Sequence, residues 1–207
     1  MNKKEAILKS VLKLVNREGF YHLNMKKIAS EAGIASGTIY LYFKGKEDLI
    51  NDLYHLAISE FNQAVLKAYV PNQAVPEGMY QMLRAAIEFY LQNPDHFSFI
   101  EQYTYSPFIF KENREENFAL LKPIHKILKA GKHEKLIDNT PDEILVAIIH
   151  GGLNTIMKLH LAKKFDLHKT KNIHLFCQSV INSIILEPKK IINPTLKSSK
   201  KRIIEKS

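Results

Sequence analysis

The sequence predicts an all-α fold of about nine helices, and three observations lead to this prediction. Apolar residues recur at the three- and four-residue spacing of helices along nearly the whole chain. No run shows the strict alternation of a half-buried strand. Glycine and proline, eight of each, often separate the apolar stripes, where they would end one helix or begin the next. With 207 residues, 45% of them hydrophobic, the chain can bury a substantial core.

Four helices are expected in the first third of the chain. The first ends at Gly19, which is placed to adopt a left-handed conformation. The second is capped by Asn24 and stops at Gly33. A third, short helix is expected over about 36–43, and a long fourth helix begins near Lys46.

Five further helices are expected in the remainder of the chain. Proline and capping signals place them after Pro76, between Pro94 and Pro107, over about 112–130, after Pro141, and in a last segment that ends at Glu187. Pro123 should kink or split the helix over 112–130. Thr140 and Glu143 form the pattern of a capping box around Pro141.

Positive charge is concentrated at the two ends of the chain. The formal net charge is +9, from 30 Lys and Arg against 21 Asp and Glu. Residues 1–46 carry a net +6, residues 187–207 a net +5, and the segment between them a net −2. Clustered lysines and arginines favour binding to a polyanion, because they neutralise phosphates and release counterions. A merely soluble basic surface would give the same composition, so charge alone leaves both interpretations open.

Several classes of protein lack support in the sequence. No apolar run approaches the roughly 18 residues of a membrane span, and no signal-peptide core precedes the first helix. A single cysteine, Cys177, allows no internal disulfide, as expected of a cytoplasmic protein. The nine histidines include no pair three or four residues apart, and no phosphate-binding loop or dinucleotide fingerprint occurs. We therefore expect no metal, no cofactor, no membrane partner and no enzymatic activity.

The second and third predicted helices form a helix-turn-helix unit at about residues 25–44. Such a unit lays its second helix in the major groove of double-stranded DNA while flanking groups bind phosphates. Ser36 and Thr38 offer short hydroxyls for phosphate, and Gly37 keeps bulk away from the DNA backbone. Tyr40 and Tyr42, two residues apart, would reach a base and a phosphate respectively, or one of them would pack locally. Apolar neighbours such as Ile28, Ala29, Ile34, Ile39 and Phe43 are expected to form the core of the unit.

A set of short motifs resembles the signature of the TetR/AcrR family of bacterial transcriptional regulators. They are Ile28-Ala29, Ala32-Gly33-Ile34, Gly37-Thr38-Ile39-Tyr40, Tyr42-Phe43 and Lys46-Glu47-x-Leu49. The chain departs from the family pattern at Leu23-Asn24, Ala35 and Gly45. The resemblance implies DNA contacts from the residues that match Lys26, Ser36, Thr38, Tyr40, Tyr42 and Lys46. Lys26 could equally be a solvated lysine.

The resemblance also implies the organisation of the whole chain. It predicts a DNA-binding domain at residues 1–46, an effector-binding and dimerisation domain at 47–186, and a basic, flexible tail at 187–207. A homodimer would place two helix-turn-helix units on the half-sites of a palindromic operator. The implied function is that of a repressor released from its operator by a small, largely apolar effector.

An aromatic cluster is the candidate effector pocket. Nine of the twenty aromatic residues fall within residues 89–118. Aromatic rings with hydroxyls suit a pocket that buries an apolar ligand and orients its polar end. An ordinary aromatic core would look the same. The candidate pocket residues are Phe89, Tyr90, Phe97, Tyr103, Tyr105 and Phe118.

The last two predicted helices carry wide apolar faces that could form half of a four-helix dimer interface. Packing within one chain would explain the same pattern. The candidate interface residues are Leu145, Ile148, Ile149, Gly152, Ile156, Phe176, Val180 and Ile184. Two other functions remain open at this point: a DNA-binding adaptor whose body holds a protein partner, and a helical enzyme with an accessory DNA-binding domain.

Overall fold

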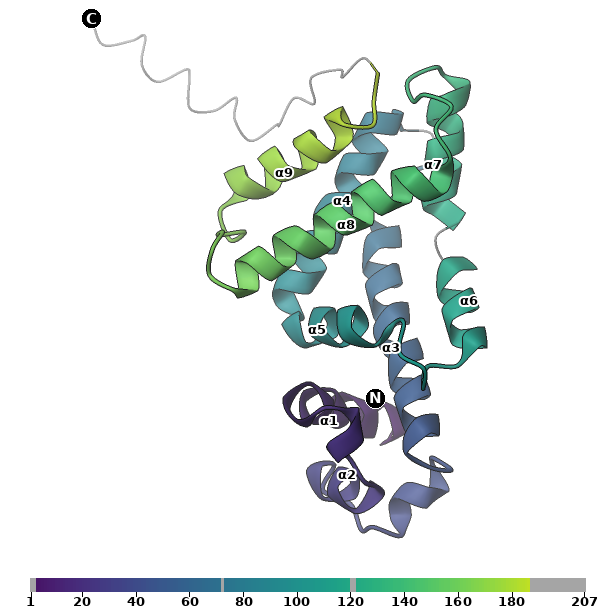
Figure 1. Cartoon of the computed structure of the whole chain (residues 1–207), viewed down its shortest axis with the longest axis vertical. Helices are drawn as coiled ribbons and strands as arrows, with labels where there is room; N and C mark the ends of the chain where they lie inside the picture. Colours follow the sequence, from purple (N-terminus) through teal and green to yellow (C-terminus); the bar gives the residue numbers. More distant parts are fainter. Residues whose placement is uncertain (1–2, 72, 120–121, 187–207) are drawn as a thin grey trace, which may run out of the picture.

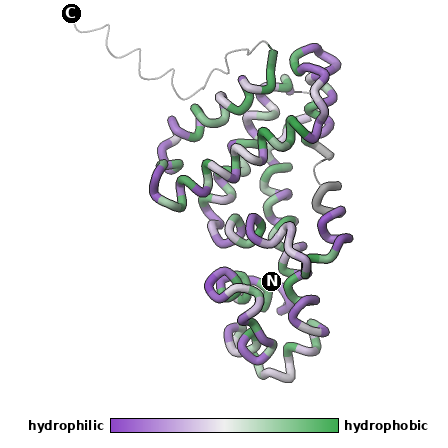
Figure 2. Tube along the Cα trace, viewed as in Figure 1, coloured by the Kyte–Doolittle hydropathy of each residue, from purple (hydrophilic) through white to green (hydrophobic). Residues whose placement is uncertain are grey.

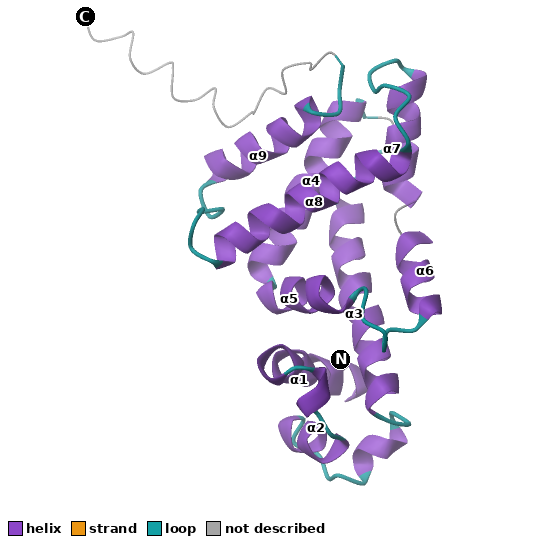
Figure 3. Ribbon diagram, in the orientation of Figure 1, coloured by secondary structure: helices purple, strands orange, loops and turns teal. Residues whose placement is uncertain are grey.

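The computed structural model describes residues 3–71, 73–119 and 122–186 and confirms the all-α fold. Within these ranges it contains nine α-helices and two 3₁₀-helices, joined by loops (Figure 3). An isolated antiparallel bridge pairs Ile137 with Ile185. The helices in chain order are α1 Lys3–Glu18, η1 Phe20–His22, α2 Met25–Glu31, η2 Thr38–Leu41, α3 Lys46–Lys67, α4 Val75–Gln92, α5 Pro94–Tyr103, α6 Lys111–Ala119, α7 Lys122–His133, α8 Asp142–Leu161 and α9 Thr170–Asn182.

The helices form two parts that α3 connects. Residues 3–45, here called the reader, lie at one end of the molecule, and residues 46–186, here called the body, form the rest (Figure 1). The 22-residue helix α3 begins against the reader and runs into the body, where it packs along α4. Hydrophobic and hydrophilic residues alternate around most helices, as expected where each helix buries one face (Figure 2).

Glycine and asparagine set the helix boundaries of the reader as predicted. Gly19 and Gly33 have φ angles of 76° and 65°, a region that favours glycine over residues with a side chain. The Asn24 side chain accepts a hydrogen bond from the backbone N–H of Lys27 at 2.9 Å and so caps α2. Ile39 and Phe43 are buried, which confirms their expected place in the reader core.

Two local predictions are corrected, and a third is confirmed. The expected helix over 36–43 is only the four-residue 3₁₀-helix η2, in a segment rich in glycine and in β-branched and aromatic residues of low helix propensity. The capping box at Thr140 does not form, because Pro141 precedes α8 and no side chain caps it. The charged helix over 112–130 is split into α6 and α7, as Pro123 allowed. The predicted basic tail at 187–207 lies outside the described residues.

Helix α8 differs from the expectation for membrane segments. By length and composition alone it is apolar enough to cross a membrane, although no single apolar run in it is long. Only 17% of the apolar window is buried within the chain. Ile144, Ile148, Leu159 and Leu161 are exposed, which gives α8 an outward apolar face of the kind that often marks an interaction surface.

Candidate nucleic-acid interface

The 3₁₀ geometry of η2 decides which side chains the reader presents. With three residues per turn, Thr38 and Leu41 share one edge, Ile39 and Tyr42 share a second, and Tyr40 forms the third. The edge of Ile39 and Tyr42 faces the core, where Ile39 is buried and Tyr42 is half-buried. The other two edges face outward, and Leu41 and Tyr40 are 81% and 58% exposed. The outward surface of η2 thus joins an aliphatic side chain to a phenol.

The predicted contact residues that precede η2 are also accessible. Lys26, Ser36 and Gly37 are exposed, and Thr38 is half-buried. A Cβ atom built on Gly37 would meet nothing within 4 Å. The fold itself therefore does not require a glycine at this residue, whereas close approach of a second molecule would.

Lys46, predicted to bind a phosphate, has an intramolecular partner. Its ammonium donates a hydrogen bond to the Phe20 carbonyl oxygen at 3.2 Å and lies 4.2 Å from the centre of the Phe20 ring. An ammonium has three N–H donors, so two remain after this bond. Lys46 thereby fixes the start of α3 to η1 while its remaining donors stay available.

Positive charge without a carboxylate partner remains around η2. Glu18 binds the ammonium of Lys27 and the guanidinium of Arg17, and the hydrogen bond from Lys27 lowers the pKa of the Glu18 carboxyl. Lys26 and Lys44 are exposed and have no carboxylate partner among the described residues. This surface of the reader is therefore suited to a polyanion.

Sequence reasoning missed Leu41 and Lys44. An α-helical period of 100° per residue gave no reason to separate Leu41 from the buried residues beside it. The 120° period of a 3₁₀-helix places it outward, but that period is not readable from four residues. Lys44 lies between Phe43 and Gly45 in the sequence, and its positive charge alone could have identified it as a candidate phosphate contact.

The reader meets the body through hydrogen bonds and stacked rings. The Phe20 ring stacks on Phe108 with centroids 3.8 Å apart, and the Phe20 backbone N–H donates to the Tyr103 hydroxyl at 3.3 Å. On another side, Glu60 of α3 binds Lys9 of α1 at 3.0 Å and His96 of α5 at 2.7 Å. Burial alone would raise the pKa of Glu60, but these two hydrogen bonds bring it below its ordinary value. The reader thus contacts α3, α5 and the loop after α5, and these contacts fix its orientation.

Most of the described residues of the predicted aromatic pocket are buried and in contact with other rings. Tyr90, Phe97 and Tyr103 are buried, and the ring of Tyr90 stacks on Phe61 at 4.6 Å. Burial strongly raises the pKa of the Tyr90 hydroxyl. Tyr105 points to solvent and Phe89 is half-buried, while the side chain of Phe118 lies outside the described part of the structure. The buried rings thus pack against one another, and the place of an effector among these residues stays a prediction.

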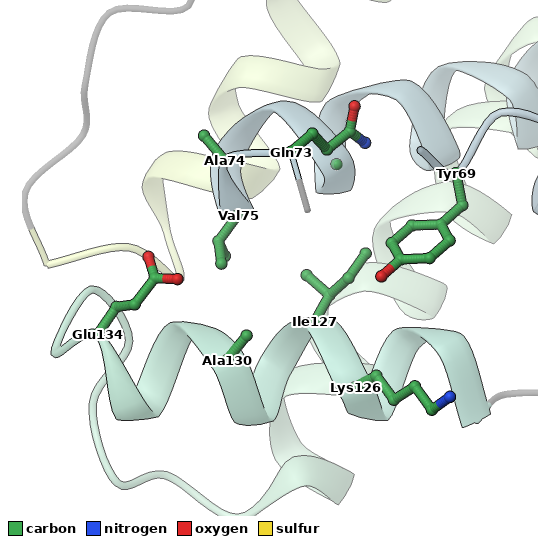
Figure 4. Close-up of a pocket in the computed structure, with 9 residues that line it drawn as sticks. Tyr69, Gln73, Ala74, Val75, Lys126, Ile127, Ala130 and Glu134 are labelled. Carbon is green, nitrogen blue, oxygen red and sulfur yellow. The ribbon is translucent and has the colours of Figure 1, made fainter. Parts of the chain in front are cut away.

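A cavity of about 340 Å³ lies elsewhere in the body, between α7 and the corner that joins α3 to α4 (Figure 4). Tyr69 and Val75 point toward α7 across this space. The Nε2 atom of Gln73 in its wall is buried and has no hydrogen-bond acceptor among the residues that the structure describes. Lys126 and Glu134 add charge to the lining, and the remaining lining residues are Ala74, Gly78, Ile127 and Ala130.

The predicted dimer residues separate into two groups. Leu145, Val180 and Ile184 are buried within the chain, because they pack inward from α8 and α9, and this corrects their placement in an outer interface. A Cβ atom built on Gly152 would lie 3.5 Å from the Phe176 ring, so these two residues lie where α8 meets α9. Ile148 is exposed, and Ile149 and Ile156 are half-buried.

The outward face of α8 combines small and large apolar residues. Ala147, Gly151 and Thr155, spaced four residues apart, are all exposed. Exposed Ile144 and Ile148 flank this stripe, and further apolar surface comes from Leu159 on α8 and Leu175 on α9. Small residues at this spacing let a second helix approach closely, and the large ones provide area to bury.

No group of three or more His, Cys, Asp or Glu side chains gathers as a metal site in the part of the chain that the structure describes. Cys177 is buried on α9, and burial raises the pKa of its thiol to about 12. Its thiolate is therefore strongly disfavoured, and with it nucleophilic or redox chemistry.

Two family profiles match adjoining parts of the chain. The profile "Bacterial regulatory proteins, tetR family" matches residues 7–53, and the profile "Tetracyclin repressor-like, C-terminal domain" matches residues 54–184. The border between the two matches falls within α3, seven residues after its start.

Individual proteins show the same similarity. An uncharacterized HTH-type transcriptional regulator of Haemophilus influenzae is 36% identical over 103 residues, which are 50% of this chain and 55% of that protein. The fatty acid metabolism regulator protein of Bacillus subtilis is 28% identical over 124 residues, 59% of each chain. The chain thus spans about half the length of the curated relatives it matches. A crystal structure of a TetR-family transcriptional regulator from H. influenzae has a TM-score of 0.72 and 27% identity, and the match covers 88% of this chain and 96% of that one.

Proposed function

Because the chain belongs to the TetR family of bacterial transcriptional regulators, we propose that it is a homodimeric repressor that a small effector releases from a palindromic operator. The observation that carries this proposal is the outward surface of η2, where Tyr40 and Leu41 are exposed. Lys26 and Lys44, which precede and follow η2 in the chain, are exposed and have no carboxylate partner among the described residues. Such a regulator acts where the chromosome is, so we place it in the cytoplasm. Since the family consists of regulators, we infer that the chain is not an enzyme.

We assign base contacts to Tyr40 and Leu41 and backbone contacts to their neighbours. An exposed leucine suits the 5-methyl group of thymine in the major groove, and the Tyr40 hydroxyl suits a base edge or phosphate. Phosphate contacts fall to the lysines and short hydroxyls around them. These residues are Lys26, Ser36, Thr38, Lys44 and Lys46, with Gly37 allowing close approach and Tyr42 reaching a phosphate from its half-buried site.

The dimer interface that we propose is the outward face of α8 and α9. Covering Ile144, Ile148 and Leu175 by the same residues of a second chain would remove a large apolar surface from water. A two-fold axis there would set the separation of the two readers, which must match half-sites about 34–36 Å apart or a multiple of that distance. One reader alone covers too few base pairs for selective binding.

The effector site that we propose is the cavity between α7 and the α3–α4 corner. Its lining combines apolar side chains with Lys126, Glu134 and the buried donor of Gln73. It suits a small molecule that has an apolar part and oxygens that accept hydrogen bonds. A medium-chain fatty acid has this chemistry, and one relative is named a fatty acid metabolism regulator. Binding weakens the operator complex only if the effector prefers a reader spacing that does not fit DNA.

The direct test is selection of duplexes from random DNA by the full chain, followed by binding measurements at several salt concentrations. We expect a palindromic consensus, a dimer in analytical ultracentrifugation, and weaker operator binding when decanoate is added. The variant Ile148→Glu places a charge on the outward face of α8 and should give a monomer with poor operator binding. Binding that shows no preference among duplexes would contradict the proposed function.

A further inference from the structure

One of the contacts between the reader and the body is made by a loop residue, Phe108. Phe108 follows α5 in the segment 104–110, and its ring lies 3.8 Å from that of Phe20, nearly parallel at 13°. Phe20 also carries the ammonium of Lys46 and the hydrogen bond to Tyr103. The loop thus touches the reader at Phe20, the residue that also holds the contacts to Lys46 and Tyr103.

Asn51 holds this loop in place. It lies on α3, five residues after Lys46, and is only 3% exposed. Its Nδ2 donates to the Phe108 carbonyl oxygen at 2.8 Å and to the Glu47 carbonyl oxygen at 2.9 Å. Its Oδ1 accepts from the backbone N–H of Phe110 at 2.7 Å and from Nδ2 of Asn113 at 2.8 Å. The carboxamide therefore uses both of its donors and both of its acceptor positions.

No other side chain would make this set of bonds. Aspartate accepts but does not donate when ionised, so it would face the Phe108 and Glu47 carbonyl oxygens with negative charge. Glutamine has the same groups on a longer stem, and leucine has the shape but none of the bonds. Asparagine pairs with the N–H and C=O of the loop as a neighbouring strand would, and this fixes the register of residues 108–110.

The other end of the loop is held by α6. The guanidinium of Arg114 donates to the carbonyl oxygens of Ser106 at 3.1 Å and Ile109 at 2.7 Å. A displacement of α6 therefore moves the loop. Asn51 belongs to the segment that matches the N-terminal family profile, and the loop belongs to the segment that matches the C-terminal profile. The hydrogen bonds between Asn51 and residues 108–110, here called the Asn51 clamp, therefore join the two segments.

We propose that Asn51 is a positioning residue that couples the body to the reader: it holds residues 108–110 on α3 so that Phe108 sets the orientation of Phe20 and, through it, of the reader. The inference rests on the proposed function, because it assumes that the reader binds DNA. Coupling between two sites is reciprocal, so DNA that immobilises the reader must also stabilise the loop.

Hydrogen exchange on the full chain, with and without a selected duplex, tests this coupling without knowledge of the effector. In the wild type, saturating duplex should slow exchange of amides 104–113 at least tenfold. In Asn51→Asp, exchange of the same amides should be at least tenfold faster without DNA, and duplex should no longer slow it, while α8 and α9 exchange as before. The matched control is Asn93→Asp, which alters a side chain that bonds to the Phe89 carbonyl oxygen within the body. It should retain the wild-type response.

A second variant covers the case in which Asn51→Asp does not fold. Phe108→Leu leaves the Asn51 bonds in place and removes the ring stacked on Phe20, so the loop should stay protected without DNA and lose its response to duplex. If duplex protects residues 104–113 in Asn51→Asp as it does in the wild type, the positioning role is wrong. If the wild type binds its duplex and the loop does not respond, the coupling is wrong and the proposed function stands. If no duplex is selected, the proposed function fails first.

Discussion

At the Lys46 end of α3, the buried carboxamide of Asn51 has a partner for every donor and acceptor, whereas toward the other end buried amide nitrogens have none. Asn62 lies on the same face of α3, about three turns further along, and its Nδ2 has no hydrogen-bond acceptor. Gln73, six residues after the end of α3, has the same deficit at Nε2. Buried polar groups without partners are rare and commonly mark a site that something else completes. The difference agrees with the positioning role that we propose for Asn51 and with the effector site that we propose beside Gln73.

The largest difference between the two ends of α3 is expected when each asparagine is replaced by leucine in a separate variant. Asn51→Leu leaves the Phe108 carbonyl, the Phe110 N–H and the Asn113 amide without their partner, and should lower the free energy of unfolding by about 3 kcal/mol. Asn62→Leu removes an amide that is already unsatisfied, and should raise it by about 1 kcal/mol. Denaturation in urea measures both. If both variants lose a similar free energy of unfolding, the Asn62 amide has hydrogen-bond partners as good as those of Asn51.

Substitution of two glycines tests how tightly the chain is packed around the cavity. A Cβ on Gly131 would lie 2.5 Å from Cδ1 of Ile137 and 3.1 Å from Cγ1 of Val75. Since Ile137 and Val75 are both buried, Gly131→Ala should cost about 1–2 kcal/mol even after the gain in helix propensity.

A Cβ on Gly78 would meet only the ends of Gln73 and Ile127, at 3.0 and 3.4 Å. Gln73 has no partner to lose at Nε2, so Gly78→Ala should change the free energy of unfolding by less than about 0.5 kcal/mol. Thermal unfolding of the two variants side by side checks this. Equal destabilisation would show that the cavity wall is as tightly packed as the surroundings of Gly131.

The helix boundaries were predictable from sequence because they depend on single residues. Gly19, Asn24, Gly33 and Gly45 each end or begin a helix through their own backbone or side chain. The 3₁₀ form of η2 was not predictable, since the choice between two hydrogen-bond patterns in four residues depends on the surrounding fold.

The sequence predicted correctly which residues of the candidate DNA interface are exposed, because that exposure depends on the local helix-turn-helix pattern. Lys26, Ser36 and Tyr40 are accessible as expected. The aromatic cluster was ambiguous, because composition does not distinguish rings that line a space from rings that fill it. The cavity and the Asn51 clamp join segments 50 to 60 residues apart, and no local pattern announces such contacts.

A third test concerns Lys46 at the start of α3, which contacts Phe20 and is proposed to contact a phosphate. Lys46→Ala should lower the slope of log affinity against log salt by about one unit, because one phosphate contact is lost. It should also lower the free energy of unfolding by about 1 kcal/mol through loss of the contacts to Phe20. The matched control is Lys44→Ala, an exposed lysine that should change the slope alone. A Lys46 variant that loses stability at an unchanged slope would make Lys46 purely structural.

The smallest effect is expected where α7 meets α8, in a partly exposed ion pair. Asp142 binds Lys132 at 2.5 Å and His125 at 3.0 Å, and these hydrogen bonds lower the pKa of the Asp142 carboxyl. A group whose pKa is lower in the folded state stabilises the fold above its unfolded pKa of about 3.9, and this contribution is lost as the pH falls through the folded value. Asp142→Asn should therefore be less stable than the wild type at pH 5, and the difference should shrink below pH 4. Urea denaturation across this range measures the difference, and a gap that stays constant down to pH 3 would mean that the pair contributes nothing through its charge.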